Sequence, residues 1–188
     1  LKDARYALAE KYLKTAIRLL TDQHTTPKNV EPFYYLGLAL KAQGRLDEAY
    51  TAFYKAAWKE EWKSPAYFSL AEIATMRGDM KLALNFVNRS LDGNGYNLRA
   101  YALKSSILRH MGNAEEALKM AAFARQKCDP LDVNLMAEQW MAAKDPNVAK
   151  TLFATMNEHQ PTALEVAASY YNCGLWSDGL ALLQQSVA

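Results

Sequence analysis

The stretch FYYLGLALKAQGRLDEAYTAF, residues 33–53, decides how the rest of the chain is interpreted. It places an aromatic residue at Phe33, small residues at Gly37 and Ala49, a glycine at Gly44 and a second aromatic at Phe53. We interpret this pattern as a helix, a turn and a second, antiparallel helix. Gly44 is expected to end the first helix in a left-handed conformation, as glycine commonly does just past a helix.

The same pattern returns twice at an interval of 34 residues, which defines the units 30–63, 64–97 and 98–131. The aligned sets are Phe33, Tyr67 and Tyr101; Gly37, Ala71 and Ser105; Gly44, Gly78 and Gly112; Ala49, Ala83 and Ala117; and Phe53, Val87 and Ala121. Small residues at the eighth and twentieth positions allow two helices to approach closely, and bulky residues at the fourth and twenty-fourth fill the space between helices. A fixed period of this length is typical of a helical repeat array.

The pattern weakens towards both ends of the chain. Residues 132–159 are expected to form a shorter unit, and residues 160–188 recover the pattern with Tyr170, Gly174 and Gly179. Residues 1–29 are expected to form a leading helix, at 3–21, and a loop. The apolar residues of this helix that are expected to contact the rest of the fold are Ala9, Tyr12, Ala16, Leu19 and Leu20. We therefore expect one helical repeat domain over residues 1–188.

Several short motifs predict where helices begin. Ser64-Pro65, Asp129-Pro130 and Asp145-Pro146 each combine an N-cap residue with proline at the first helical position. Asp79 follows Gly78 as another N-cap, and Asn113 with Glu116 resembles a capping box.

Composition independently favours an all-α fold. The chain has 31 alanines and 25 leucines but only six valines and three isoleucines, and β-strands are normally rich in β-branched residues. No apolar run approaches the roughly 18–20 residues that a membrane span needs. The sequence predicts no membrane association.

The charge distribution argues against nucleic-acid binding. The net charge is only +2, whereas nucleic-acid binders usually carry a concentrated basic surface. Residues 132–188 hold two lysines against six acidic residues, so the net charge is −4 there and +6 in residues 1–131. Cys128 and Cys173 fit neither a zinc site nor a disulfide framework and are interpreted as core or half-buried thiols.

No residue pattern points to catalysis. His24, His110 and His159 lack partners at metal-ligand spacing, and the common nucleotide, esterase and metalloprotease motifs are absent. We therefore predict no cofactor, no metal and no enzymatic activity for these residues, although a catalytic module elsewhere in a longer protein is compatible with them.

The residues at positions 4, 8, 15, 20 and 24 of the first unit, from Phe33 to Phe53, resemble the tetratricopeptide repeat. This resemblance implies a right-handed superhelix of antiparallel helix pairs whose concave face is lined by the first helix of each unit. The lining residues selected as a partner-binding groove are Tyr34, Leu38, Lys41, Phe68, Glu72, Thr75, Arg99, Ser106 and Arg109. Tyr34 and Leu38 depart from the Lys/Asn/Arg clamp of chaperone-binding members, so we predict no chaperone-tail binding.

The predicted groove runs from aromatic and apolar residues to a basic end at Arg99 and Arg109. Arginine suits a carboxylate, and exposed aromatics are good anchors for a peptide. A second interpretation is that Tyr34 and Phe68 pack against neighbouring repeats. Trp58 and Trp62, four residues apart and so on one helix face, are interpreted either as an anchor for another domain or as part of the core between repeats.

A narrower resemblance links Tyr34–Gly44, Ala49–Trp62 and Leu164–Leu183 to the C-terminal repeats of large bacterial proteins that carry a carbohydrate-active-like β-sandwich module. The predicted function is a protein-interaction scaffold that binds a protein or peptide, including a neighbouring domain of the same longer chain. The alternative is an accessory repeat region of a glycoside hydrolase-like enzyme. Homo-oligomerisation and the cellular compartment stay open.

Overall fold

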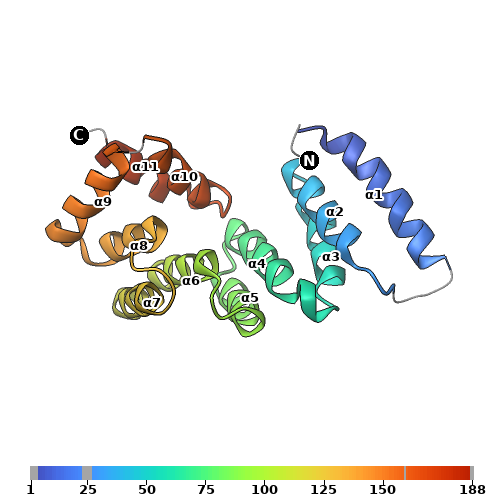
Figure 1. The fold of residues 1–188 in the computed structure, drawn as a ribbon, viewed down its shortest axis with the longest axis horizontal. Helices are drawn as coiled ribbons and strands as arrows, with labels where there is room; N and C mark the ends of the chain where they lie inside the picture. Colours follow the sequence, from blue (N-terminus) through green and yellow to red (C-terminus); the bar gives the residue numbers. More distant parts are fainter. Residues whose placement is uncertain (1–3, 23–26, 159, 187–188) are drawn as a thin grey trace. The chain divides into compact units, whose positions relative to one another are not determined.

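The computed structural model describes residues 4–22, 27–158 and 160–186, in which eleven helices and no β-strand occur. The chain divides into two compact units, Leu1–Leu70 and Ala71–Ala188. The first unit contains α1 (Tyr6–Thr21), α2 (Glu31–Ala42), α3 (Leu46–Ala56) and most of α4 (Glu60–Met76). The second contains the end of α4, α5 (Met80–Gly93), α6 (Leu98–His110), α7 (Ala114–Lys127), α8 (Val133–Ala143), α9 (Pro146–Glu158), α10 (Gln160–Tyr171) and α11 (Trp176–Ser186) (Figure 1). The predicted all-α fold of paired helices is confirmed.

The first helix pair, α2 and α3, shows why the repeat needs small residues. A Cβ atom added at Gly37 would lie only 2.6 Å from ring carbons of Phe53, a separation that real Cβ atoms do not show. Ala49 and Phe53 are fully buried on the facing helix. The eighth and twenty-fourth repeat positions therefore meet at this contact, and the twentieth is buried on the same helix as the twenty-fourth.

The second unit repeats this contact with other small residues. Ser105, at the eighth position, donates a hydrogen bond from its hydroxyl to the carbonyl oxygen of Ala117, at the twentieth, over 3.2 Å. In the last pair, a Cβ at Gly179 would lie 3.3 Å from the carbonyl oxygen of Ala167. Close approach within the pair is thus kept although the residues change.

Glycines at the fifteenth repeat position follow the first helix in the pairs that begin with α2, α4, α6 and α10, whereas Lys144 takes this place after α8. Gly44 has φ +74°, and the amide of Arg45 just beyond it donates to the carbonyl of Leu40 over 3.0 Å. Side chains with a Cβ rarely adopt this left-handed conformation. The equivalent glycines, Gly78, Gly112 and Gly174, also have positive φ, so the predicted left-handed turns are confirmed.

The predicted start of α4 at Ser64-Pro65 is wrong. The helix begins at Glu60, and Pro65 lies inside it. The earlier start places Trp62 against the buried cluster formed by Val30, Phe33 and their neighbours. Pro65 has no amide to donate to the carbonyl of the exposed Glu61, where water can replace the missing hydrogen bond. Packing of the half-buried Trp62 on this cluster therefore accompanies the loss of one backbone bond.

The other predicted helix starts give mixed results. The Asp145-Pro146 start of α9 and the Asp79 cap of α5 are confirmed, since Asp79 accepts from the Leu82 amide over 3.0 Å. The Asp129-Pro130 start is wrong, because α8 begins at Val133 and Asp132 is its cap, with the Leu135 amide 2.8 Å away. Asn113 precedes α7 as expected, but its side chain makes no cap hydrogen bond.

Helix α1 packs on α2, but the predicted inward face is partly wrong. Tyr12 and Leu19 are each 65% exposed, whereas Ile17 packs against the Val30–Phe33 cluster. The α1 orientation is held by Glu10, whose carboxylate accepts hydrogen bonds from Arg45 over 2.7 Å and from Gln43 over 3.1 Å. A hydrogen bond from Lys14, together with those from Gln43 and Arg45, lowers the pKa of Glu10 to about 2, so the carboxylate stays ionised.

The Gly37–Phe53 contact yields a stability prediction. Gly37→Ala should lower the free energy of unfolding by about 1–3 kcal/mol, because the added methyl overlaps the ring and overpacks the pair. Helix propensity alone would change stability in the opposite direction by about 1 kcal/mol. Urea unfolding monitored by circular dichroism measures the difference.

The matched test combines Gly37→Ala with Phe53→Leu. The smaller side chain removes part of the overlap, so the double variant should lose less stability than the sum of the two single variants. Strict additivity, or a more stable Gly37→Ala variant, would contradict the close-contact explanation.

Candidate functional site

The nine residues predicted to line the binding groove fall in both compact units. Tyr34, Leu38, Lys41 and Phe68 lie in the first unit, and Glu72, Thr75, Arg99, Ser106 and Arg109 lie in the second. Phe68, Glu72, Thr75 and Ser106 are buried; Tyr34, Leu38, Lys41 and Arg109 are half-buried; Arg99 is exposed. That all nine line one groove stays a prediction.

In the first unit, Tyr34, Leu38 and Lys41 form one stripe of α2, since residues four and seven positions apart share a helix face. The Tyr34 ring packs against Trp62, with ring centroids 5.0 Å apart, and against Tyr35 at 5.7 Å. Tyr35 and Trp62 also meet, at 6.0 Å. We call Tyr34, Tyr35 and Trp62 the aromatic cluster.

The aromatic cluster joins the core on one side only. Tyr34 also contacts the fully buried Phe53, with ring centroids 5.6 Å apart. Tyr35 is exposed, and Tyr34 and Trp62 are half-buried. Packing therefore accounts for one side of Tyr34, while part of the cluster remains on the surface with its rings held in place.

The predicted residues on α4 are mainly buried. Phe68 contributes its side chain to the interior. Thr75 donates its hydroxyl to the carbonyl oxygen of Ala71 over 2.9 Å. Glu72 is buried and lies 3.6 Å from a guanidinium nitrogen of Arg99, so this ion pair links α4 to α6.

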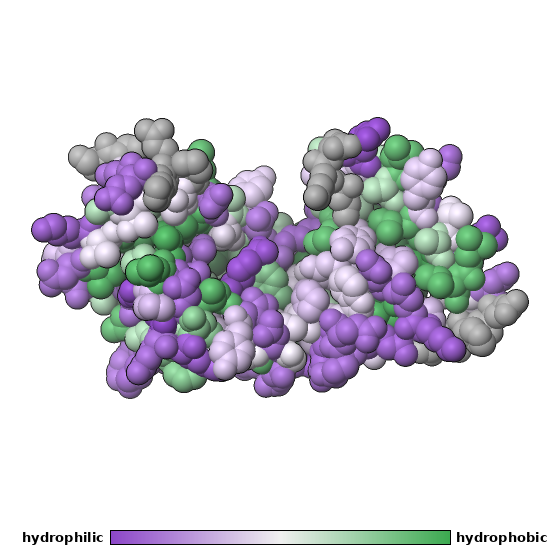
Figure 2. Space-filling view, in the orientation of Figure 1, coloured by the Kyte–Doolittle hydropathy of each residue, from purple (hydrophilic) through white to green (hydrophobic). Residues whose placement is uncertain are grey.

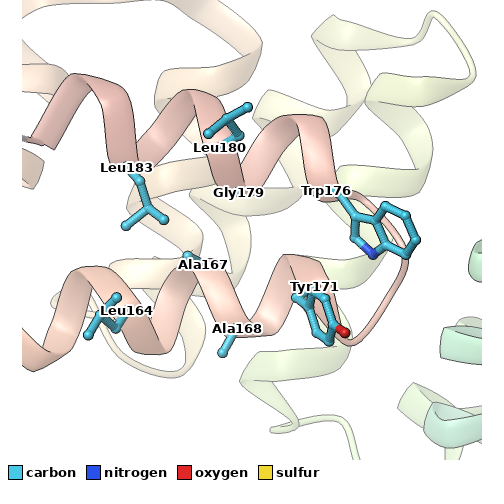
Figure 3. A pocket seen from close by; sticks show the side chains of 8 residues that line it. All are labelled: Leu164, Ala167, Ala168, Tyr171, Trp176, Gly179, Leu180 and Leu183. Carbon is cyan, nitrogen blue, oxygen red and sulfur yellow. The ribbon is translucent and has the colours of Figure 1, made fainter.

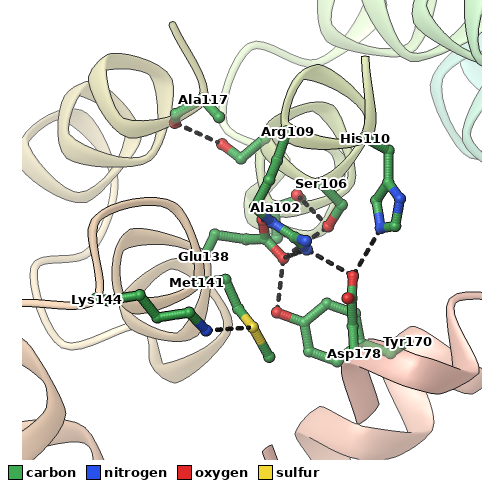
Figure 4. Close-up of polar contacts among 11 residues, drawn as sticks. Ala102, Ser106, Arg109, His110, Ala117, Glu138, Met141, Lys144, Tyr170 and Asp178 are labelled. Atoms are coloured by element: carbon green, nitrogen blue, oxygen red, sulfur yellow. Dashed lines mark hydrogen bonds and ion pairs between the residues drawn. The ribbon is translucent and has the colours of Figure 1, made fainter. Parts of the chain in front are cut away.

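In the second unit, Ser106 and Arg109 on α6 contact a buried carboxylate from α8 (Figure 4). Glu138 is 1% exposed. It accepts hydrogen bonds from the Ser106 hydroxyl over 2.7 Å and from the Tyr170 hydroxyl over 2.6 Å, and Arg109 nitrogens lie 3.4 Å from its two oxygens. A buried carboxylate is tolerated only when such partners replace water. Glu138 thus ties α6, α8 and α10 together.

Arg109 also reaches the last helix pair, together with His110. A guanidinium nitrogen of Arg109 lies 2.6 Å from Asp178 Oδ2, and Nε2 of His110 lies 2.8 Å from the same oxygen. At the turn between α10 and α11, a Cβ on Gly174 would lie 3.0 Å from Cα of Met76. This turn therefore lies against the end of α4, and the first turn of α11 lies against the end of α6. We call Ser106, Arg109, His110, Glu138, Tyr170 and Asp178 the polar network.

The protonation states suit permanent ion pairs. Burial raises the pKa of Asp178, but hydrogen bonds from His110 and Arg109 outweigh it and lower the pKa to about 2. Burial and the charge of Glu138 raise the pKa of Tyr170 well above its ordinary value, which keeps the hydroxyl as a donor. Burial opposes the charge of Arg109, but the two carboxylates raise its pKa.

Arg109, at the basic end of the predicted groove, thus contacts two carboxylates, those of Glu138 and Asp178, which belong to this chain. Sequence reasoning selected Ser106 and Arg109 but missed Glu138, Tyr170 and Asp178. One signal was present: Glu138 is a lone acid in the apolar run LMAEQWM, residues 135–141. Nothing in the sequence indicates which cation, 29 residues away, would pair with it.

Other candidate chemistry is limited. Among the residues that the structure describes, no three His, Cys, Asp or Glu side chains gather to hold a metal. His24 and His159 lie outside the described residues. Cys173 is buried and Cys128 is half-buried. Within the same described part of the chain, no helix combines the length and apolarity that crossing a membrane requires.

Comparison with known proteins supports the fold. No protein-family model matches the chain, and no curated protein matches it. A solved tetratricopeptide repeat protein from Parabacteroides merdae ATCC 43184 is 19% identical and aligns over 99% of this chain and 74% of its own length, with a TM-score of 0.71. A MamA structure is 14% identical over 99% of this chain and 89% of its own length, with a TM-score of 0.62. At these identities the similarity shows the fold alone, which is that of a tetratricopeptide-type repeat.

Glu138 is expected to dominate the stability of the second unit. Glu138→Ala should lower the free energy of unfolding by about 3–5 kcal/mol, because it removes the acceptor shared by Ser106, Tyr170 and Arg109 and leaves their donors unsatisfied, with Asp178 remaining as a carboxylate on Arg109. Glu115→Ala, at an exposed ion pair with Lys119, is the control and should change stability by less than about 1 kcal/mol. Equal effects of the two substitutions in urea unfolding would show that the polar network is not stabilising.

The lowered pKa of Asp178 predicts that its contribution to the free energy of unfolding depends on pH. Its folded-state pKa of about 2 lies below the ordinary 3.8, so its stabilisation is present above about pH 4 and is lost as the pH falls towards 2. Asp178→Asn should therefore lower the free energy of unfolding by about 1–2 kcal/mol at pH 6 and by much less near pH 2. Urea unfolding at both pH values measures this, and an equal loss at both would contradict it.

Proposed function

We propose that the chain is a non-enzymatic scaffold that binds a protein segment on the α2 surface of its first unit. The observation that carries the proposal is the aromatic cluster beside Leu38 and Lys41. The partner is a segment of another protein or of another domain of the same longer chain. The repeat fold supports the proposal, since helical solenoids commonly bind partners on surfaces lined by successive helices.

The aromatic cluster has the properties of an anchor site. Its three rings pack on one another, and Tyr34 also packs on Phe53, so little side-chain freedom is left to lose when a partner binds. Large aromatic side chains dominate the energetics of many protein interfaces. Leu38, one turn along α2 from Tyr34, extends the apolar surface.

The charges of the same stripe indicate the partner chemistry. Lys41 stands one turn beyond Leu38, and its amine suits a carboxylate. A matching segment would carry an aromatic or aliphatic side chain followed by an acidic residue. Arg109, at the basic end of the predicted groove, is held by Glu138 and Asp178. The first unit, where Tyr35 is exposed and Tyr34, Leu38 and Trp62 are half-buried, is the better candidate for recognition.

The test uses random twelve-residue peptides displayed on phage, selected against the 188-residue chain. Peptides that bind this surface should be rich in an apolar residue near an acidic one. Leu38→Glu should weaken a selected peptide at least about tenfold in fluorescence anisotropy, because a carboxylate replaces apolar contact and repels the acidic residue.

Matched variants separate recognition from folding. Leu82→Glu, at an exposed position of α5, should leave peptide affinity unchanged. Tyr34→Ala is a poor test, because Tyr34 also packs on Phe53 and its removal would change both folding and binding. The melting temperature of each variant must therefore be measured together with its peptide affinity. Selected peptides that bind Leu38→Glu and the unmodified chain equally would overturn the proposed surface.

A further inference from the structure

The last helix pair presents an apolar surface that the polar network does not use. Leu164, Ala167, Ala168 and Tyr171 form one stripe of α10, and Trp176, Gly179, Leu180 and Leu183 form one stripe of α11 (Figure 3). Together they line a shallow cavity of about 350 Å³. The four largest exposed side chains, Leu164, Tyr171, Trp176 and Leu180, are 57–66% exposed. We call these eight residues the α10–α11 face.

The α10–α11 face has the shape of a groove into which a helix could dock. Small residues, Ala167, Ala168 and Gly179, lie between larger side chains of the two helices (Figure 3). The Tyr171 and Trp176 rings stack, with centroids 6.1 Å apart, and form one end. A helix that carries apolar residues every three to four positions fits a groove between two such stripes. Apolar patches of this kind commonly mark interaction sites.

The charge around this face favours a basic partner. Residues 160–188 contain Glu165 and Asp178 but no lysine or arginine. Asp178 is directed to Arg109 and His110, whereas Glu165 is exposed one residue from Leu164. An approaching helix with basic residues beside its apolar stripe would meet complementary charge.

Helix α1 carries an exposed, largely apolar stripe with basic residues beside it. Leu8, Tyr12, Thr15 and Leu19 are exposed and recur at intervals of four, three and four residues, so they share one face. Figure 2 shows hydrophobic surface along α1, on the right of the view. Lys11 and Arg18, seven residues apart and exposed, flank it on one side. We call these six residues the α1 outer stripe.

We propose that the chain associates head to tail with a second copy of itself, the α1 outer stripe of one copy docking on the α10–α11 face of the next. The two surfaces differ, so the contact is heterologous, and each copy that uses one surface keeps the other. Helix α1, with 16 residues, is about 24 Å long, enough to follow both stripes of the face. This association is independent of the peptide-binding surface on α2.

The experiment is sedimentation velocity of the 188-residue chain over a concentration series. The mean mass should rise with concentration above that of one 21.1 kDa chain. Leu19→Glu and Leu180→Glu each place a carboxylate in one of the two surfaces. Each variant alone should need at least about tenfold more protein to associate, because every contact then contains one damaged surface.

Mixing the two variants gives the decisive measurement. Leu180→Glu retains an intact α1 outer stripe, and Leu19→Glu retains an intact α10–α11 face. A mixture should therefore form a one-to-one dimer that does not grow, since only one intact pair of surfaces remains. Leu131→Glu, an exposed leucine outside both surfaces, is the matched control and should behave as the unmodified chain.

Three outcomes would overturn the proposal. The unmodified chain could stay a monomer throughout the series, which would leave the face to a different helical partner. Leu180→Glu could abolish association while Leu19→Glu leaves it unchanged, which would indicate a symmetric contact between two α10–α11 faces. The mixture could fail to form a dimer although both variants keep the melting temperature of the unmodified chain.

Discussion

The contact between the two helices of a repeat is the constraint on which the rest of the structure depends. In the first pair the Phe53 ring occupies the space that a side chain at position 37 would need, with only 2.6 Å available for a Cβ. Later pairs meet the same constraint with Ser105 against Ala117 and with Gly179 against Ala167. Small residues at one contact position allow large ones at the next to fill the interior, so alanine and leucine together dominate the composition.

Within the second unit, a polar constraint is added to this apolar one. Glu138 is buried among residues of three helices and is compensated by Ser106, Arg109 and Tyr170. Such a network specifies one arrangement, because any shift of α10 would leave a charge or a hydroxyl without its partner. It also commits the inner side of α6 to the chain's own carboxylates. A helical repeat protein can thus use one helix for its own architecture while another, here α2, keeps aromatic side chains at the surface.

The parts of this structure that were predictable are those with a local cause. A glycine such as Gly44 or a cap such as Asp79 acts within a few residues, so a period and a short motif suffice. Glu138 and Asp178 were missed because their partners lie 29 to 69 residues away, and an acidic side chain does not specify its cation. Tyr12 and Leu19 were assigned inward because α1 is apolar on more than one face. For Tyr34 the sequence left open both groove lining and packing against neighbouring repeats, without indicating that its ring packs on Phe53 of the same repeat.

The α1 outer stripe and the α10–α11 face are expected to pack in the same way as two helices within a repeat. Inside each repeat, a helix packs where small residues let it approach and larger ones surround it; the α10–α11 face has the same arrangement, with Ala167, Ala168 and Gly179 between large side chains. A helix docked on this face would pack on α10 and α11 in the way that helices already pack on one another within the repeats. One helix on one groove makes a small interface, and small interfaces are usually weak. Association through these surfaces should therefore respond to protein concentration, and the charges of Lys11 and Arg18 should make it sensitive to salt.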